Sequence, residues 1–185
     1  MSNPFKGKPP KIMKSPVNKM EPKIHPSVFV APNATIVGDV EIDEGTNIWF
    51  NVVIRAEMSK ITIGKNCSIQ ENVVIHTEPG TELHIGDNVL MGHCAMVHGP
   101  GKIGNNVMIG ISSTILQAHD IADNVVIAAG GVARGKLETM GMYAGNVVAQ
   151  RKKELKKSDI RNLQAGITFY VDNGKKFKAA LEEEK

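Results

Sequence analysis

The sequence predicts an all-β fold, a parallel β-helix whose three-stranded coil repeats every eighteen residues. Three observations predict it: an aliphatic residue recurs every six positions, the fourth residue after it is usually small, and corner pairs containing asparagine or glycine recur between them. Six is a multiple of the two-residue strand period, so successive aliphatic residues can all point inward. An amphipathic α-helix would space them by three and four residues instead.

The recurring aliphatic residues, here called anchors, stand in one register apart from two interruptions. They are Val30, Ile36, Ile42, Ile48, Ile54, Ile63, Ile69, Ile75, Ile85, Met91, Val97, Ile103, Ile109, Ile115, Ile121 and Ile127. The small residues that follow them include Ala34, Val40, Thr46, Val52, Cys67, Val73, Val89, Ala95, Val107 and Ser113. Stacked anchors would form a central aliphatic column, and each coil would depend on its neighbours for stability.

Three segments follow from this pattern. Residues 1–23 form a basic, proline-rich leader with six lysines and one acid, and solvated disorder is the favoured interpretation of it. Residues 24–145 form the β-helix. Residues 146–185 form a linker and a C-terminal α-helix that begins near Ser158, where a capping residue precedes an apolar stripe.

The composition restricts the location of the protein. Two cysteines do not make a disulfide framework, and the leader lacks the apolar run of a signal peptide. No stretch approaches the roughly 20 apolar residues that a membrane span needs. With a net charge of only +3, we expect a cytoplasmic protein with neither a membrane nor a nucleic acid as its partner.

The anchor register is interrupted twice. Three residues are inserted between Ile54 and Ile63, and four between Ile75 and Ile85. Once these insertions are allowed for, Arg55, His76 and His98 each follow an anchor by one position and lie one full coil apart. They should project from one face, one above another.

His93 and Gln70 belong to the preceding hexads and should share the adjacent face. His93 would therefore lie around a corner from His76 and His98 and could not easily join them within one chain. Packing one face against the adjacent face of the next subunit in a homotrimer would bring the three imidazoles together. Three histidines with an open fourth position are typical of a catalytic zinc site.

The other polar candidates have plainer interpretations. His25, His84 and His119 are interpreted as ordinary surface or corner residues. A structural or incidental role is expected for Cys94, and Arg55 is expected to form a buried pair with Glu57 at the seam, because an unpaired buried charge is costly.

The six-residue pattern resembles the hexapeptide-repeat family, whose left-handed parallel β-helices supply the expected hand of the coil. A more specific resemblance, over about residues 24–172, is to gamma-class carbonic anhydrases and their compact subgroup often called ferripyochelin-binding proteins. The segments that resemble this family are residues 55–57 (Arg-Ala-Glu), 68–72, 74–76 (Val-Ile-His), 92–100 and 143–146.

This resemblance implies that His76, His93 and His98 ligate Zn²⁺, or else Fe²⁺ or Co²⁺, with no organic cofactor. A metal of this kind lowers the pKa of water to about 7, so that hydroxide attacks CO2 and bicarbonate forms. The resemblance also implies that Gln70 orients that hydroxide and that Glu71 positions polar groups around it.

Three further residues take roles from the same resemblance. Arg55 and Glu57 would hold the trimer interface, and Tyr170 could approach the site from the C-terminal helix.

The sequence departs from the family at several of these places. Glu57 and Glu71 replace aspartates, Ser68 replaces an asparagine, and Met58 replaces a functional glutamate. The loop of residues 77–83 is shorter than the acidic loop that supplies proton transfer in the best-studied branch.

Glu78 or Glu82 could take over proton transfer, although each is also an ordinary surface carboxylate. Two alternatives to CO2 hydration therefore stay open: a metal-stabilised trimeric scaffold, and acyl transfer or thioester hydrolysis on acyl-CoA.

Overall fold

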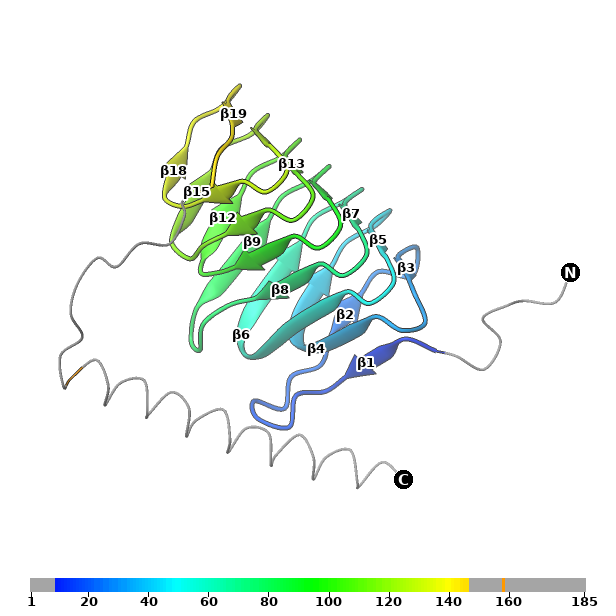
Figure 1. Ribbon diagram of the computed structural model, residues 1–185. Helices are drawn as coiled ribbons and strands as arrows, with labels where there is room; N and C mark the ends of the chain where they lie inside the picture. The colour runs from blue at the N-terminus through cyan, green and yellow to red at the C-terminus, as the bar shows by residue number, and fades with distance from the viewer. Residues whose placement is uncertain (1–8, 147–157, 159–185) are drawn as a thin grey trace, which may run out of the picture. The chain divides into compact units, whose positions relative to one another are not determined.

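The computed structural model of the chain describes residues 9–146 and residue 158. Its elements within those residues are short parallel strands (Figure 1). They are β1 (Lys11–Met13), β2 (Lys23–Ile24), β3 (Phe29–Val30), β4 (Thr35–Ile42), β5 (Asn47–Ile48), β6 (Val53–Ile63), β7 (Ser68–Ile69), β8 (Val74–His76), β9 (Glu82–Ile85), β10 (Leu90–Met91), β11 (Met96–His98), β12 (Gly101–Ile103), β13 (Met108–Ile109), β14 (Thr114–Ile115), β15 (His119–Ile121), β16 (Val126–Ile127), β17 (Val132–Ala133), β18 (Lys136–Leu137) and β19 (Met142–Tyr143).

These strands wind into the predicted left-handed parallel β-helix. A 7-stranded sheet in the order β19-β16-β13-β10-β7-β5-β3 forms one face. The other two faces are the arm β8-β11-β14-β17 and the arm β9-β12-β15-β18 of a 12-stranded sheet. The two arms meet at β6, which runs from one face to the next without a break and pairs with both β8 and β9.

The anchor column is confirmed. Every anchor from Ile36 to Ile127 is buried, while Val30, in the outermost full hexad, is partly buried and packs against the core. The small residues four positions after the anchors are also buried. Burial of these aliphatic side chains stabilises the coil by about 25 cal/mol per Å² of apolar surface removed from water.

Asparagines turn the corners between hexads. Asn51, Asn66, Asn72, Asn88 and Asn106 all have φ between 54° and 63°. Asparagine tolerates this left-handed conformation better than other residues with a Cβ because its short amide can hydrogen-bond locally. The left-handed asparagines thus lie between successive anchors, where the anchor spacing places the corners of the coil.

The expectation of disorder is wrong for part of the leader. Lys11–Met13 forms β1, which pairs in parallel with Thr35–Val37 of β4. Ser15 is fully buried, and its hydroxyl donates a 3.0 Å hydrogen bond to the carbonyl oxygen of Glu57. The physical reason is that the first coil would otherwise expose the unpaired amides and carbonyls of β4 at an open edge.

His119 was expected at the surface or at a corner, and the surface alternative is wrong, since only 3% of it is exposed; it directly follows Ala118, which turns a corner with a φ of 63°. It stands four residues after Ile115, at the inward position that small residues occupy elsewhere. Its ring fits because its partner in the coil below is Gly101, where a Cβ would lie 2.5 Å from the ring. Nδ1 lies 3.0 Å from the Leu116 carbonyl oxygen, while Nε2 has no hydrogen-bond partner among the described residues. Burial lowers the pKa of His119 below 6.5.

The expected C-terminal helix lies almost wholly outside the described residues, as does Tyr170. The division at residues 145–146 stays a prediction. In the described part of the chain, no helix has the length and apolar character needed to cross a bilayer.

Candidate metal centre

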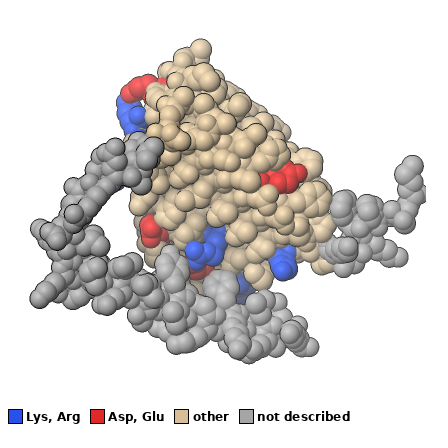
Figure 2. Space-filling model, viewed as in Figure 1, with Lys and Arg blue, Asp and Glu red and all other residues tan. Residues whose placement is uncertain are grey.

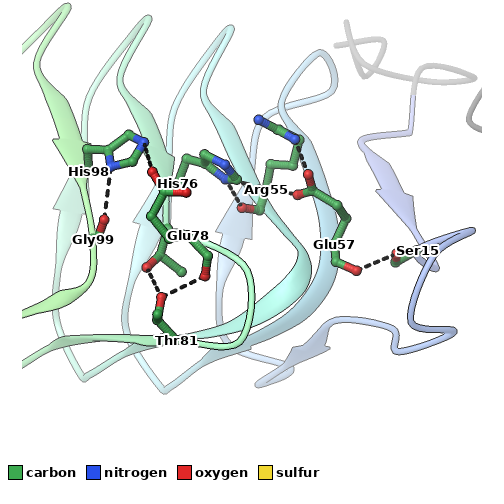
Figure 3. A network of polar contacts seen from close by, with 9 residues as sticks. Ser15, Arg55, Glu57, His76, Glu78, Thr81, His98 and Gly99 are labelled. Atoms are coloured by element: carbon green, nitrogen blue, oxygen red, sulfur yellow. Dashed lines mark hydrogen bonds and ion pairs between the residues drawn. The ribbon is translucent and has the colours of Figure 1, made fainter. Parts of the chain in front are cut away.

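The predicted stacking of Arg55, His76 and His98 is confirmed. Arg55 on β6 is the register partner of His76 on β8, which is in turn the partner of His98 on β11. Because every coil pairs with the next, the three side chains rise in one column along one face (Figure 3). The imidazole centroids of His76 and His98 are 5.4 Å apart, with their planes nearly perpendicular.

Main-chain carbonyl groups fix the orientation of both rings. Nδ1 of His76 lies 2.8 Å from the carbonyl oxygen of Arg55, and Nδ1 of His98 lies 2.9 Å from that of Gly99. A carbonyl can only accept, so each Nδ1 must carry the proton. In the neutral form of each ring, Nε2 therefore keeps its lone pair, which is the state that a metal ligand requires.

The surroundings of His76 keep it neutral. Burial lowers its pKa below 6.5, and the positive charge of Arg55 acts in the same direction. The hydrogen bond to the Arg55 carbonyl and the charge of Glu57 oppose this shift. At neutral pH the imidazole is thus uncharged, with its one proton on Nδ1, as metal binding through Nε2 demands.

His93 lies on the neighbouring face, just after β10 of the 7-stranded sheet. The chain turns the corner at Cys94, whose φ is 61°, before β11 begins. Nδ1 of His93 lies 2.9 Å from Oε2 of Glu71. Within a single chain, residues 9–146 hold no group of three histidine, cysteine or acidic side chains close enough to bind a metal ion. The structure thus brings together two of the three predicted ligands and keeps the third apart.

The first insertion supplies a carboxylate to this column. In the pairing of β4 with β6, Gly38 is opposite Ala56 and Asp39 is opposite Lys60, so the three inserted residues 57–59 bulge out. The bulge carries Glu57, which forms an ion pair with Arg55. Glu57 is 3% exposed, and its other carboxylate oxygen lies 4.0 Å from His76 Nδ1.

The second insertion supplies another carboxylate. It forms the loop between β8 and β9, where Thr81 Oγ1 donates a 2.6 Å hydrogen bond to the Glu78 carbonyl and also contacts Thr77 Oγ1. Gly80 N donates to the Met58 carbonyl oxygen, so this loop rests on the first bulge. Oε1 of Glu78 lies 3.7 Å from Nε2 of His98 (Figure 3).

The two acids considered for proton transfer therefore have different surroundings. Glu78 faces Nε2 of His98, whereas Oε2 of Glu82 pairs with Nε2 of His84 at 2.9 Å. His84 is exposed, as expected. Glu78 is the one that adjoins the histidine column.

Gln70 and Cys94 complete the predicted set. Gln70 is partly buried directly before Glu71, on the same face as His93, and Cys94 is exposed at the corner. Sequence reasoning missed Ser15, which supports the bulge through the Glu57 carbonyl. No periodic pattern includes Ser15, so the sequence held no signal for it.

Comparison with known proteins agrees with this fold and site. The family model described as bacterial transferase hexapeptide (six repeats) matches residues 21–56. A solved hexapeptide transferase family protein from Anaplasma phagocytophilum superposes with a TM-score of 0.66 at 28% identity, covering 84% of this chain and 92% of that one. The chain is thus a hexapeptide-repeat β-helix protein.

Two relatives define the family further. A carbonic anhydrase from Geobacillus kaustophilus is 35% identical over 184 residues, which is 99% of this chain and 94% of that protein. Gamma carbonic anhydrase 2, mitochondrial, of Arabidopsis thaliana is 34% identical over 119 residues, 61% of this chain and 42% of that protein. The chain belongs to the gamma-class carbonic anhydrase family.

Proposed function

We propose that this protein catalyses the reversible hydration of CO2 to bicarbonate at metal sites between the subunits of a homotrimer. The observation that carries the proposal is the pair formed by His76 and His98. Their rings stand 5.4 Å apart in adjacent coils, and each is held by a carbonyl group that leaves Nε2 available.

The residues present fit a divalent metal ion. His76 and His98 would supply two ligands from one subunit and His93 the third from its neighbour, in the geometry of a catalytic site with one open position. Zn²⁺ is the ion proposed, and Fe²⁺ or Co²⁺ would suit the same imidazole donors. When bound, such an ion supplies Lewis acidity that makes water a nucleophile at neutral pH.

The outward-facing residues support a second copy at this seam. On the face of His76 and His98, one column of outward residues is mostly apolar: Thr35, Val53, Val74, Met96, Thr114 and Val132. On the face of His93, the corresponding column contains polar and apolar residues, and its last four members are apolar: Phe29, Asn47, Ser68, Leu90, Met108, Val126 and Met142. On the third face the corresponding column is wholly polar: Lys23, Glu41, Thr62, His84, Lys102, Asp120 and Lys136.

The surface contrast therefore follows the faces. Four apolar side chains on these two faces are each 38–45% exposed: Val74, Leu90, Met108 and Val132. Groups of large apolar side chains on a surface are typical of a site that a partner covers. The view in Figure 2 shows few charged side chains over the body of the β-helix. We infer that the two faces carrying the histidines pack together between subunits, while the polar face meets solvent.

Residues around the histidines would handle substrate and proton. The Gln70 amide would orient the reacting groups beside His93. The Arg55–Glu57 pair would sit at the seam, with its carboxylate buried against His76. Glu78 would accept the proton released on hydration of CO2 and pass it to buffer. Its carboxylate is suited to this because Oε1 lies 3.7 Å from Nε2 of His98.

The test is CO2 hydration by stopped-flow on metal-loaded protein, together with metal content. The parent should hold about three metal ions per trimer and hydrate CO2, whereas His98→Ala should lose both properties. His84→Ala, which removes an exposed histidine on the polar face, is the matched control and should retain both. Equal hydration by the parent and His98→Ala would contradict the proposal.

One observation favours a second candidate. A solved structure that this chain resembles over most of its length is a hexapeptide transferase family protein. Transfer of acyl groups from acyl-CoA would need a CoA-binding groove rather than converging histidines. Saturable binding of a CoA thioester, unchanged in His98→Ala, would favour that candidate.

A metal-stabilised scaffold is the remaining alternative. In that case the parent protein would bind metal and would lose its trimeric state when a chelator removes the metal. It would not hydrate CO2 at any buffer concentration.

The cytoplasm is the compartment we propose, since Cys67 and Cys94 are both free thiols. Burial raises the pKa of Cys67, which keeps that thiol protonated and unreactive.

A further inference from the structure

A third departure from the six-residue repeat lies in the leader, at the same corner of the coil as the two insertions beside the histidine column. Ile36 and Ile42 of β4 stand six positions apart, on either side of this corner. Their register partners in the first coil, Ile12 and Ile24, stand twelve positions apart. The chain between β1 and β2, residues 14–22 and here called the leader loop, is therefore six residues longer than the repeat needs.

The leader loop reaches the bulge of residues 57–59 across the coil that lies between them. That coil has no insertion at the corner and turns it at Gly38, where a Cβ would overlap the carbonyl oxygen of Ala56. Ser15 of the leader loop is fully buried, and its hydroxyl donates a 3.0 Å hydrogen bond to the carbonyl oxygen of Glu57 (Figure 3). This bond joins residues that are two coils apart.

The Ser15 hydroxyl also closes its own loop. Its oxygen accepts hydrogen bonds from the amides of Val17 and Asn18 at 3.0 and 3.3 Å, and Ser15 N donates to the Met20 carbonyl oxygen at 2.8 Å. With one proton donated to Glu57 and two bonds accepted, every hydrogen-bonding capacity of the hydroxyl is used. The shape of the leader loop and the position of the Glu57 carbonyl therefore depend on each other.

The bulge needs such support because the strand ladder does not provide it. Residues 57–59 are skipped in the pairing of β4 with β6, and residues in a bulge lose their regular ladder bonds. Ser15 holds the carbonyl oxygen of Glu57, and Gly80 N, from the second insertion, donates to that of Met58 at 2.8 Å. The main chain of the bulge is thus held from both sides.

We propose that Ser15 is a positioning residue of the metal centre, through which the leader loop fixes the bulge and keeps the Glu57 carboxylate against Arg55 and His76. Oε2 of Glu57 lies 4.0 Å from Nδ1 of His76. A carboxylate on that side of the ring makes the imidazole a stronger donor to a metal at Nε2. The effect on metal binding rests on the proposed function, whereas the support of the bulge belongs to the metal-free chain as well.

The first experiment measures metal affinity on the full-length protein. Zn²⁺-loaded parent, Ser15→Ala, Ser15→Thr and Ser27→Ala proteins are titrated with a competing chelator. Ser15→Ala should bind Zn²⁺ about 2–10-fold more weakly, the range that corresponds to the loss of one hydrogen bond. Ser15→Thr keeps the hydroxyl and should recover most of the loss. Ser27→Ala removes an exposed hydroxyl that accepts from Gly45 N at another corner, and it should match the parent.

A second background separates positioning from a general loss of structure. In Glu57→Ala no carboxylate is left to position, so adding Ser15→Ala should leave the Zn²⁺ affinity unchanged. The same further loss in both backgrounds would mean that Ser15 acts without Glu57, and this would overturn the positioning role.

The third measurement needs no metal. Amide hydrogen exchange in metal-free, full-length protein should be about 2–10-fold faster at Gly80 in Ser15→Ala than in the parent, because the Met58 carbonyl that it bonds is less firmly held. The amide of Gly99, which donates to the His76 carbonyl oxygen at 2.8 Å outside the bulge, should exchange as in the parent. Unchanged exchange at Gly80 together with parental Zn²⁺ affinity in Ser15→Ala would overturn the inference.

These measurements distinguish a failure of this inference from a failure of the proposed function. A parent that binds no Zn²⁺, with Gly80 exchange that still depends on Ser15, would contradict the metal site and support the positioning of the bulge. A parent that binds Zn²⁺ and hydrates CO2, with neither affinity nor exchange altered by Ser15→Ala, would support the metal site and contradict the role of Ser15.

Discussion

The fit of the His119 ring over Gly101 gives a sharp test of the core. In Gly101→Ala the new Cβ would lie 2.5–2.6 Å from Cε1, Nε2 and Cδ2 of His119, all atoms of one buried ring. Gly101 is not in the left-handed region, so alanine meets no backbone strain there. The whole cost is therefore steric.

The size of the effect follows from two opposing contributions. Overpacking of a buried site costs about 1–3 kcal/mol. The lower entropy of the unfolded alanine chain returns about 0.4–1 kcal/mol. We expect Gly101→Ala to lower the free energy of unfolding by about 1–2 kcal/mol in the parent.

In a His119→Ala background the same substitution should be neutral or stabilising, because the methyl group enters the space vacated by the ring. The effect on the unfolded chain is the same in both backgrounds, so the coupling between the two sites should equal the overpacking cost of about 1–3 kcal/mol. Urea unfolding of the parent, both single variants and the double variant measures it, with the slope of the transition checked for constancy. An equal cost of Gly101→Ala in both backgrounds would refute the inward placement of His119.

Three further predictions follow. Because burial lowers the pKa of His119 in the folded protein, the unfolded chain binds a proton at this residue at higher pH than the folded chain does. The contribution of neutral His119 to folding stability is therefore complete above pH 6.5 and is lost as pH falls through the pKa of the folded state. Thermal unfolding between pH 8 and pH 5 should show this loss in the parent and less of it in His119→Leu; parallel curves would contradict it. Glu78→Gln should slow CO2 hydration at least about 10-fold in dilute buffer and recover in concentrated buffer, whereas Glu82→Gln should hydrate CO2 as the parent does. In urea titrations Ile109→Ala should lower the free energy of unfolding by about 2–5 kcal/mol, because Ile109 is a buried anchor. Ile111 is 51% exposed, so Ile111→Ala should lower it by much less. Similar losses in the two variants would argue against the anchor column.

The fold was predictable because each coil repeats one physical constraint. An inward residue every sixth position fixes the strand register, and a slip of one residue would turn every anchor outward. The same constraint placed Arg55, His76 and His98 in one column, since register arithmetic needs only the anchors and the lengths of the two insertions.

The contacts within the insertions were not predictable in the same way. Loops of three and four residues have no periodicity, so nothing in the sequence separated Glu78, beside His98, from Glu82, beside His84. The pairing of β1 with β4 also escaped prediction, because a leader rich in lysine and proline carries the composition of a disordered segment.

A regular repeat makes its own departures informative. Where the hexad continues, the stack determines each residue, and chemistry has room only at outward positions. Where it is broken, the chain leaves the stack and can bring a carboxylate back against it, as the bulge at Glu57 and the loop at Glu78 both do beside the same column. His119 shows a similar departure inside the coil, since its imidazole fits a position otherwise held by small residues because its partner in the coil below is Gly101. In this protein the places where the repeat fails are therefore the places where polar side chains approach the stacked histidines.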